Sequence, residues 1–236
     1  MLNIVLLDSE VIQNNMSVIT GRQHRHLTKV LKVQVGSKFR VGQINGMIGE
    51  ALVTHVDHQT TIIETYLTAS PPTPLPSSLI LALPRPKMLR RILQSIASMG
   101  LKYIYIINAC KVEKSYWHSK CLEPDKIEEQ LILGLEQAGD TVMPEISCYP
   151  FFKQFIEDKL GDIICPESNF VAHPKASMSC PIDLSGESLI AVGPEGGFTP
   201  FEIAQFEDYG FRAVTLGPRI LRVENAVPAI LARLYP

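Results

Sequence analysis

The pattern of apolar and polar residues divides the chain into a β-rich first part and an alternating second part. In the first part, three runs predict strands because they alternate or are rich in β-branched residues: Lys38–Gly42, Ile48–Val56 and Thr60–Leu67. Gln23–Lys32 predicts a short helix with Leu27, Val30 and Leu31 on one apolar face. Together with the glycines between the runs, these elements predict a small β-barrel.

A proline-rich segment follows the predicted barrel. Ala69–Ser78 carries prolines at positions 71, 72, 74 and 76, and proline neither continues a helix nor occupies a central strand. Such a segment is extended and fairly stiff. We therefore place a domain boundary there, which gives one domain over residues 1–70 and a second over residues 71–236.

Strand and helix patterns alternate after this boundary. Strands are predicted at Leu79–Leu83, Lys102–Ile107, Asp162–Cys165, Ser188–Val192 and Arg212–Leu216. Helices are predicted at Pro86–Met99, Pro124–Ala138, Phe151–Leu160, from the capping box Thr199–Glu202 to Gly210, and at Val223–Leu234. The alternation predicts an α/β fold with a largely parallel sheet covered on both faces.

Charge is unevenly distributed, although the net charge is only −2. The stretch from Val11 to Gly49 has no acidic residue and carries six cations: Arg22, Arg25, Lys29, Lys32, Lys38 and Arg40. A second acid-free stretch, from Thr65 to Val112, carries Arg85, Lys87, Arg90, Arg91, Lys102 and Lys111. Such segregation is typical of a protein with one face toward a polyanion. We predict that Arg22, Arg25, Lys29 and Lys32 bind RNA; the alternative is a solvated basic face.

Cysteine and histidine usage favours neither a metal site nor a secreted protein. The five cysteines, which form no CxxC pair, are Cys110, Cys121, Cys148, Cys165 and Cys180. His24 and His26 lie in the first basic stretch and are expected at the surface or facing RNA. No apolar run is long enough to span a bilayer, and the first residues do not look like a signal peptide. We therefore expect a cytoplasmic protein with no metal and no membrane contact.

Two glycine-bearing loops follow successive predicted strands. Gly193–Gly197 comes directly after Ser188–Val192, and Gly217–Arg222 comes directly after Arg212–Leu216. Ligands bind at the carboxyl ends of parallel strands, and glycine permits close backbone approach. The loops therefore predict a ligand site, with tight strand-to-helix turns as the alternative. Neither loop has the form of a known phosphate-binding loop or of a nucleophile elbow.

The segments Ala191–Thr199 and Leu216–Ala226 resemble the two C-terminal signature segments of RsmE methyltransferases. The resemblance implies a PUA-like RNA-binding barrel followed by a SPOUT methyltransferase domain with a C-terminal trefoil knot. It implies a homodimer that uses S-adenosylmethionine and methylates N3 of a uridine in 16S ribosomal RNA. The partner would be ribosomal RNA or the small ribosomal subunit, and the process ribosomal RNA modification.

The resemblance also implies roles for individual residues. The cofactor would contact Cys165, Pro166, Glu167, Gly193, Pro194, Glu195, Gly196, Gly197, Leu216, Gly217, Ile220, Leu221 and Arg222. The enzyme must stabilise the negative charge that spreads onto uracil oxygens when N3 loses its proton, and we assign this role to Arg222. Glu224 would orient Arg222 or help remove the proton. The alternative for Arg222 and Glu224 is an ordinary ion pair at a helix start.

Four positions depart from the family pattern. Arginine is usual where this chain has Asp140 and Lys32, glutamate where it has Ser98, and threonine where it has Asn225. These departures put the identity of the target nucleotide in doubt more than the class of reaction. A SPOUT methyltransferase for another RNA nucleotide, a non-catalytic RNA-binding protein of the same fold and an unrelated nucleotide-binding α/β enzyme therefore remain as alternatives.

Overall fold

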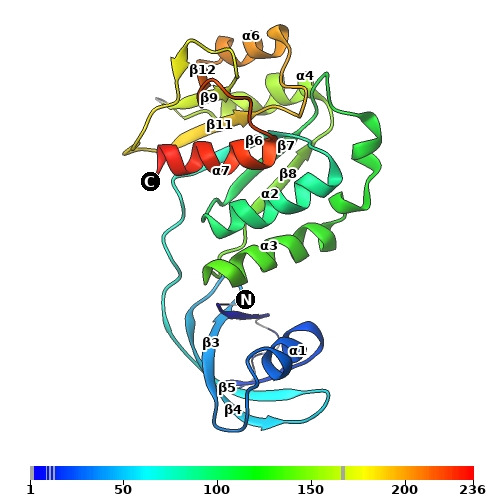
Figure 1. Cartoon of the computed structure of the whole chain (residues 1–236), viewed down its shortest axis with the longest axis vertical. Helices are drawn as coiled ribbons and strands as arrows, with labels where there is room; N and C mark the ends of the chain where they lie inside the picture. The colour runs from blue at the N-terminus through cyan, green and yellow to red at the C-terminus, as the bar shows by residue number, and fades with distance from the viewer. Residues whose placement is uncertain (1–2, 9, 11, 13, 166–167) are drawn as a thin grey trace. The chain divides into compact units, whose positions relative to one another are not determined.

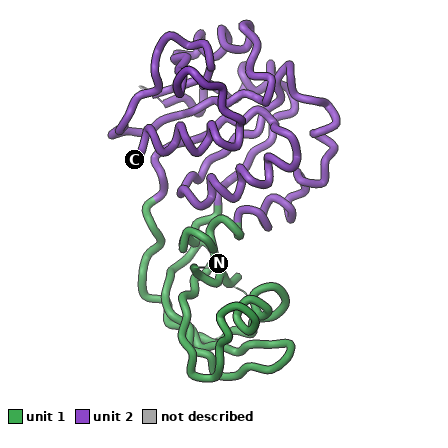
Figure 2. The backbone as a smooth tube through the Cα atoms, in the orientation of Figure 1, with its two compact units in different colours: residues 1–73, 132–143 green, residues 74–131, 144–236 purple. Residues whose placement is uncertain are grey.

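The structure, a computed structural model, describes residues 3–8, 10, 12, 14–165 and 168–236. The chain forms two compact units, which Figure 2 distinguishes by colour. The first unit contains residues 1–73 and 132–143, and the second contains residues 74–131 and 144–236. The first division falls within the proline-rich segment. Nothing in the sequence pattern predicted that residues 132–143, which lie far beyond the proline-rich segment, belong to the first unit.

The first unit is a small sheet of five strands (Figure 1): β1 (Val5–Leu7), β2 (Met16–Ile19), β3 (Lys38–Gln43), β4 (Ile48–Val56) and β5 (Thr61–Ala69). Their order is β1-β3-β4-β5-β2, with β1 parallel to β3 and the other pairs antiparallel. Helix α1 (Gly21–Lys29) places Leu27 in one apolar core with Val41, Val53 and Ile63 of the sheet. The short strands β1 and β2 were not predicted.

The apolar face predicted for the first helix is partly wrong. Leu27 is fully buried, but Val30 and Leu31 are 54% and 40% exposed. The helix ends at Lys29, so these two residues leave the helical register that would have aligned them with Leu27.

The second unit contains a seven-stranded sheet: β6 (Ser77–Ala82), β7 (Tyr103–Ile107), β8 (Glu145–Tyr149), β9 (Asn169–Ala172), β10 (Met178–Ser179), β11 (Ser188–Val192) and β12 (Arg212–Thr215). The order is β10-β12-β9-β11-β6-β7-β8, and every pairing is parallel. A parallel sheet was predicted and is confirmed, whereas β8 and β10 were not foreseen.

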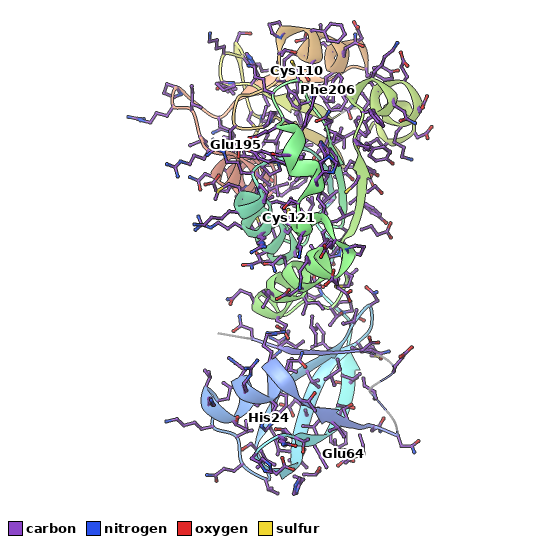
Figure 3. All side chains as sticks on the ribbon, turned by 90° about the vertical axis from the view of Figure 1, so that its right-hand side faces the viewer. His24, Glu64, Cys110, Cys121, Glu195 and Phe206 are labelled. Carbon is purple, nitrogen blue, oxygen red and sulfur yellow. The ribbon has the colours of Figure 1, made fainter. Side chains whose placement is uncertain are left out.

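Helices cover both faces of this sheet. The helices that lie wholly in the second unit are α2 (Pro86–Ser98), α4 (Phe152–Phe155), α5 (Gly161–Ile163), α6 (Pro200–Asp208) and α7 (Val223–Leu234), with the 3-10 turns η2 (Lys114–His118) and η3 (Lys120–Leu122) and the π-helical turn η4 (Ile156–Leu160). Helix α3 (Pro124–Ala138) begins in the second unit and ends in the first. Helices α2 and α7 lie side by side on one face, with α4 on the other (Figures 1 and 3). Among the described residues, no helix has the length and apolar character needed to cross a membrane.

One predicted strand is wrong. Asp162–Cys165 was assigned as a strand that follows a helix ending at Gly161. Instead, Gly161 keeps a helical φ of −58°, and the helical path continues through η4 and α5 to Ile163. The strand is β9, which begins at Asn169. The consecutive isoleucines 163 and 164 favour a strand by composition, but the π-helical turn carries the chain on as helix.

The strand order brings three loops together. Strand β9 lies between β11 and β12, and all three run in the same direction. Their carboxyl ends therefore meet at one edge of the sheet, where α/β folds bind ligands. The threading of the C-terminal segment into a trefoil knot stays a prediction.

Candidate functional site

A cavity of about 240 Å³ lies at the edge where β9, β11 and β12 end. Nine of the residues predicted to contact a cofactor line it: Gly193, Pro194, Glu195, Gly197, Leu216, Gly217, Ile220, Leu221 and Arg222. Its lining also includes residues that the sequence did not single out, among them His173, Thr215 and Arg219. Gly196 and Glu224 belong to the same segments but are not among the lining residues.

The first glycine loop needs glycine for two different reasons. A Cβ at Gly193 would lie 2.9 Å from the backbone nitrogen of Phe198, too close for any side chain. Gly197 has a φ of +66°, and its amide donates to the carbonyl of Pro194 at 2.7 Å, which closes a tight turn. A Cβ at Gly197 would meet nothing within 4 Å, so this position faces open space.

Two contacts from neighbouring strand ends brace this loop. The carboxylate of Glu195 accepts a hydrogen bond from the backbone amide of Arg85, at the start of α2, at 3.0 Å. The ammonium of Lys111, after β7, donates to the carbonyl of Gly196 at 2.7 Å. The loop is therefore held by the segments that follow β6 and β7.

A buried carboxylate fixes the helix that follows the loop. Glu202 is 3% exposed and accepts from the backbone amide of Thr199 at 2.7 Å and from its hydroxyl at 2.9 Å. This completes the predicted capping box, with Pro200 in the first turn. The same carboxylate also accepts from the amide of Cys110 at 2.7 Å, a contact that the capping pattern could not predict.

The second glycine loop carries exposed apolar residues. Gly217 has a φ of +127°, a conformation that L side chains rarely adopt, and its amide donates to the hydroxyl of Thr215 at 3.3 Å. Ile220 is 80% exposed and Leu221 is 39% exposed, although both line the cavity. An apolar wall that remains open is suited to a ligand or to a second protein surface.

Arg222 occupies the N-cap position of α7. Its carbonyl accepts from the amides of Asn225 and Ala226 at 2.9 and 2.8 Å, while its side chain is exposed at the cavity. Arginine is a poor N-cap, because its side chain accepts no hydrogen bond and its charge opposes the positive helix end. Among the described ion pairs, none joins Arg222 to Glu224, so the helix-start ion pair is not formed here.

Cys165 lies at the amino end of β9 and not at the cavity. The expectation that it follows a strand is wrong, because that strand assignment was wrong. Its amide donates to the side chain of Asn169 at 2.9 Å, and burial, with a smaller effect from Glu187, raises the pKa of its thiol. Pro166 and Glu167 lie outside the described residues. The loop that reaches the cavity from β9 is 172–174.

The predicted RNA-binding residues differ in their surroundings. The guanidinium of Arg22 forms an ion pair at 2.7 Å with Glu136, whose side chain is fully buried, and Gln23 donates to the same carboxylate at 3.0 Å. Arg25 and Lys29 are exposed on α1, as is Lys32 just beyond it. The surface position expected for His24 is wrong. This ring is 5% exposed and lies 2.8 Å from the hydroxyl of Thr61.

The departures from the family pattern lie mostly away from the cavity. Asp140 is 3% exposed, and its carboxylate accepts from the amides of Thr141 and Val142 at 2.6 and 3.0 Å. It therefore stabilises the turn after α3. The hydroxyl of Ser98 donates to the carbonyl of Ser95 at 2.8 Å. Only Asn225, in the first turn of α7, adjoins the cavity wall.

A metal centre finds no support in the residues that are described. These contain no group of three or more histidine, cysteine, aspartate or glutamate side chains able to hold an ion. The polar side chains that line the cavity include His173, Glu195, Thr215, Arg219 and Arg222.

Comparison with known proteins gives consistent results. A family model described as an RNA methyltransferase domain matches residues 71–235. The ribosomal RNA small subunit methyltransferase E of Treponema pallidum is 32% identical over 98% of this chain and 90% of its own length. Methyltransferase E 1 of Borreliella burgdorferi is 26% identical over 97% of this chain and 95% of its own.

Two solved structures share the fold over nearly the whole chain. One is a ribosomal RNA small subunit methyltransferase E from Neisseria gonorrhoeae bound to S-adenosyl methionine, with a TM-score of 0.75 and 21% identity. The other is a putative methyltransferase from Legionella pneumophila with the same bound cofactor, with a TM-score of 0.75 and 20% identity. Each alignment covers 98% of this chain and 96% of the other.

Proposed function

Because this chain belongs to the family of RNA methyltransferase domains, we propose that it transfers the methyl group of S-adenosylmethionine to N3 of a uridine in 16S ribosomal RNA. The observation that carries the proposal is the cavity built by the two glycine loops after β11 and β12. The near full-length similarity to small subunit methyltransferases E supports ribosomal RNA of the small subunit as the substrate. N3 of a uridine is the target that the family resemblance implies.

The cavity is suited to S-adenosylmethionine. Gly197 and Gly217 both have positive φ angles and open space where a Cβ would stand, so a ligand can approach the backbone there. Leu216, Ile220 and Leu221 supply an apolar wall. When bound, the cofactor supplies an electrophilic methyl group without a metal ion.

The residues of the chain must make uridine N3 a nucleophile. N3 is a neutral imide nitrogen, and its lone pair becomes available when its proton leaves. Arg222 would stabilise the charge that then spreads onto the uracil oxygens, because a guanidinium offers planar, fixed donors. Glu224, two residues further on, would orient Arg222 or accept the proton.

A homodimer is part of the proposal. Ile220 and Leu221 stay exposed beside the cavity, and a second copy of the chain would cover them. Because small-subunit ribosomal RNA lies in the cytoplasm, the protein would act there. Light scattering coupled to gel filtration measures the mass in solution, and a monomeric mass at micromolar concentration would contradict the dimer.

The direct test is methyl transfer in vitro. The purified chain is incubated with radiolabelled S-adenosylmethionine and small ribosomal subunits or 16S RNA lacking this modification, and the product is mapped by nuclease digestion and mass spectrometry. One 3-methyluridine in the RNA supports the proposal. Methylation elsewhere would indicate a methyltransferase for another nucleotide, and RNA binding without transfer would indicate a non-catalytic protein.

Arg25 and Lys29 provide a test of RNA binding by the first unit. Replacing both with glutamine is expected to lower the salt dependence of RNA affinity by about 1.5–2 units of log K against log salt, if each contacts one phosphate of duplex-like RNA. Arg22 is left in place because its ion pair with buried Glu136 makes it a structural residue. Lys126 of α3 and Lys153 of α4 are exposed lysines outside the basic stretch, and replacing both with glutamine is the matched control. If the Arg25 and Lys29 variant has the salt slope of the unchanged protein, this segment is only a solvated face.

A further inference from the structure

Two segments outside the cofactor loops adjoin the first glycine loop, and we call them the rim segments; they are not among the residues that line the cavity. The first is the start of α2, which the hydrogen bond from the amide of Arg85 to Glu195 places beside the first glycine loop. The second is the chain after β7, which the bond from Lys111 to the carbonyl of Gly196 places beside the same loop. Both segments follow strands whose carboxyl ends face the cavity edge of the sheet.

These rim segments are basic. Arg85, Lys87, Lys111 and Lys114 are all exposed. In Figure 3, several side chains that end in nitrogen project on the same side of the second unit as Glu195. Two acids lie nearby, since Glu195 accepts from the start of α2 and Glu113 accepts from the hydroxyl of Ser115 at 3.0 Å, but the four cations outnumber them. Together with Arg222 at the cavity, the rim presents an excess of positive charge to an approaching ligand.

Two aromatic side chains lie among these cations. Tyr116 and Trp117 are half-buried on η2. The indole nitrogen of Trp117 donates to the side chain of Asn108, directly after β7, at 3.0 Å. The pKa of Tyr116 is raised, first by desolvation and then by the hydrogen bond and charge of Glu113, while Arg85 acts in the opposite direction. Glu113 and Arg85 are therefore the charged groups that act on the Tyr116 hydroxyl.

Methylation at N3 requires that the target uridine is not base-paired. The N3–H group of uridine is its Watson–Crick donor, so N3 is accessible to a methyl donor only when the base is unpaired. The nucleotide must therefore leave any helix, which costs stacking energy. Proteins that hold unpaired nucleic acid combine cations for the phosphates with aromatic rings for the bases.

We propose that Arg85, Lys87, Tyr116 and Trp117 form a track for the single-stranded RNA next to the target uridine. Arg85 and Lys87 contact phosphates, while the rings of Tyr116 and Trp117 stack on flanking bases. This proposal rests on the proposed function, because the track would hold the RNA on either side of an unpaired uridine at the cavity. It is separate from the basic helix of the first unit.

The test uses the full chain and a short fluorescent oligouridine, with an RNA hairpin stem of similar length as comparison, in anisotropy titrations. Trp117→Ala is expected to weaken oligouridine binding roughly 5–150-fold, the usual loss of one base–aromatic stack, whereas Trp117→Phe retains most of the affinity. Arg85→Gln with Lys87→Gln, which keep every backbone hydrogen bond, should lower the salt slope by about 1.4 units on a single strand.

Control measurements separate this proposal from the proposed function. Lys126→Gln with Lys153→Gln should leave the salt slope unchanged, and calorimetric titration with S-adenosylmethionine reports the cofactor site in every variant. A track exists if the oligouridine losses occur, whether or not methyl transfer is found. Unchanged oligouridine affinity in the double variant and in Trp117→Ala, or a clear preference for the hairpin stem, would overturn the track even in an active methyltransferase.

Discussion

Replacing Gly197 with valine is expected to raise the dissociation constant for S-adenosylmethionine by roughly 10–100-fold. Gly197 lines the cavity, and a Cβ there would point into open space within it. A branched side chain would therefore occupy part of the volume that the ligand fills. Extra methyl groups in a filled site cost about 1–3 kcal/mol. Since about 1.4 kcal/mol is a factor of ten in affinity, isothermal titration calorimetry resolves the change.

Gly210 offers a matched control for this variant. Its φ is +82°, against +66° for Gly197, and a Cβ there also meets nothing within 4 Å, but it follows α6 and does not line the cavity. Valine at either position strains the backbone, so both variants should lose some stability. Only Gly197→Val should lose the cofactor. Equal affinities in the two variants would remove this loop from the cofactor site.

Local signals predicted the α/β fold of the second unit and the two glycine loops of its cavity, and the predicted cofactor contacts make up nine of the eighteen residues that line it. Ser188–Val192 and Pro124–Ala138 have the predicted bounds, because Gly193, Pro124 and Gly139 mark where these elements end or begin. Val223–Leu234 also has the predicted bounds, although Arg222 does not cap it. The assignment of a ligand site to the two glycine loops then followed from the rule that ligands bind at the carboxyl ends of parallel strands. The family resemblance implied a PUA-like barrel followed by a SPOUT domain; an α/β fold with a small N-terminal sheet, shared with two solved methyltransferase structures, is confirmed.

What the sequence missed depends on contacts between distant residues or on a local irregularity. The ion pair between Arg22 and Glu136 joins residues 114 positions apart, so the basic stretch alone gave no sign that Arg22 is engaged. The π-helical turn at Ile156–Leu160 displaced the predicted strand and, with it, the loop that reaches the cavity from β9. His173 was therefore not recognised as a lining residue.

The N-cap residue of α7 departs from the usual capping preference, and this departure bears on its function. Arg222 is an unfavourable N-cap, with no side-chain cap hydrogen bond and a cation beside the positive end of α7. Serine or aspartate there would stabilise the helix by about 1 kcal/mol relative to a residue that cannot cap. Such a mismatch at a cavity wall is typical of a residue retained for function.

Arg222→Lys is accordingly expected to lower the rate of methyl transfer by roughly 10²–10³-fold, the usual loss for one preorganised donor. Lysine keeps the charge but loses the planar pair of donors that can follow charge spreading over the uracil ring. Cofactor affinity should change far less, because the interaction strengthens as N3 loses its proton.

Single-turnover methylation at saturating RNA and cofactor measures this step apart from binding. Arg219→Lys, in the same loop, shows how much a shortened cation at the rim costs by itself, and its loss should be clearly smaller. A normal rate in Arg222→Lys together with weakened S-adenosylmethionine binding would make Arg222 a clamp for the cofactor. Charge on the uracil would then have to be stabilised by another group that lines the cavity.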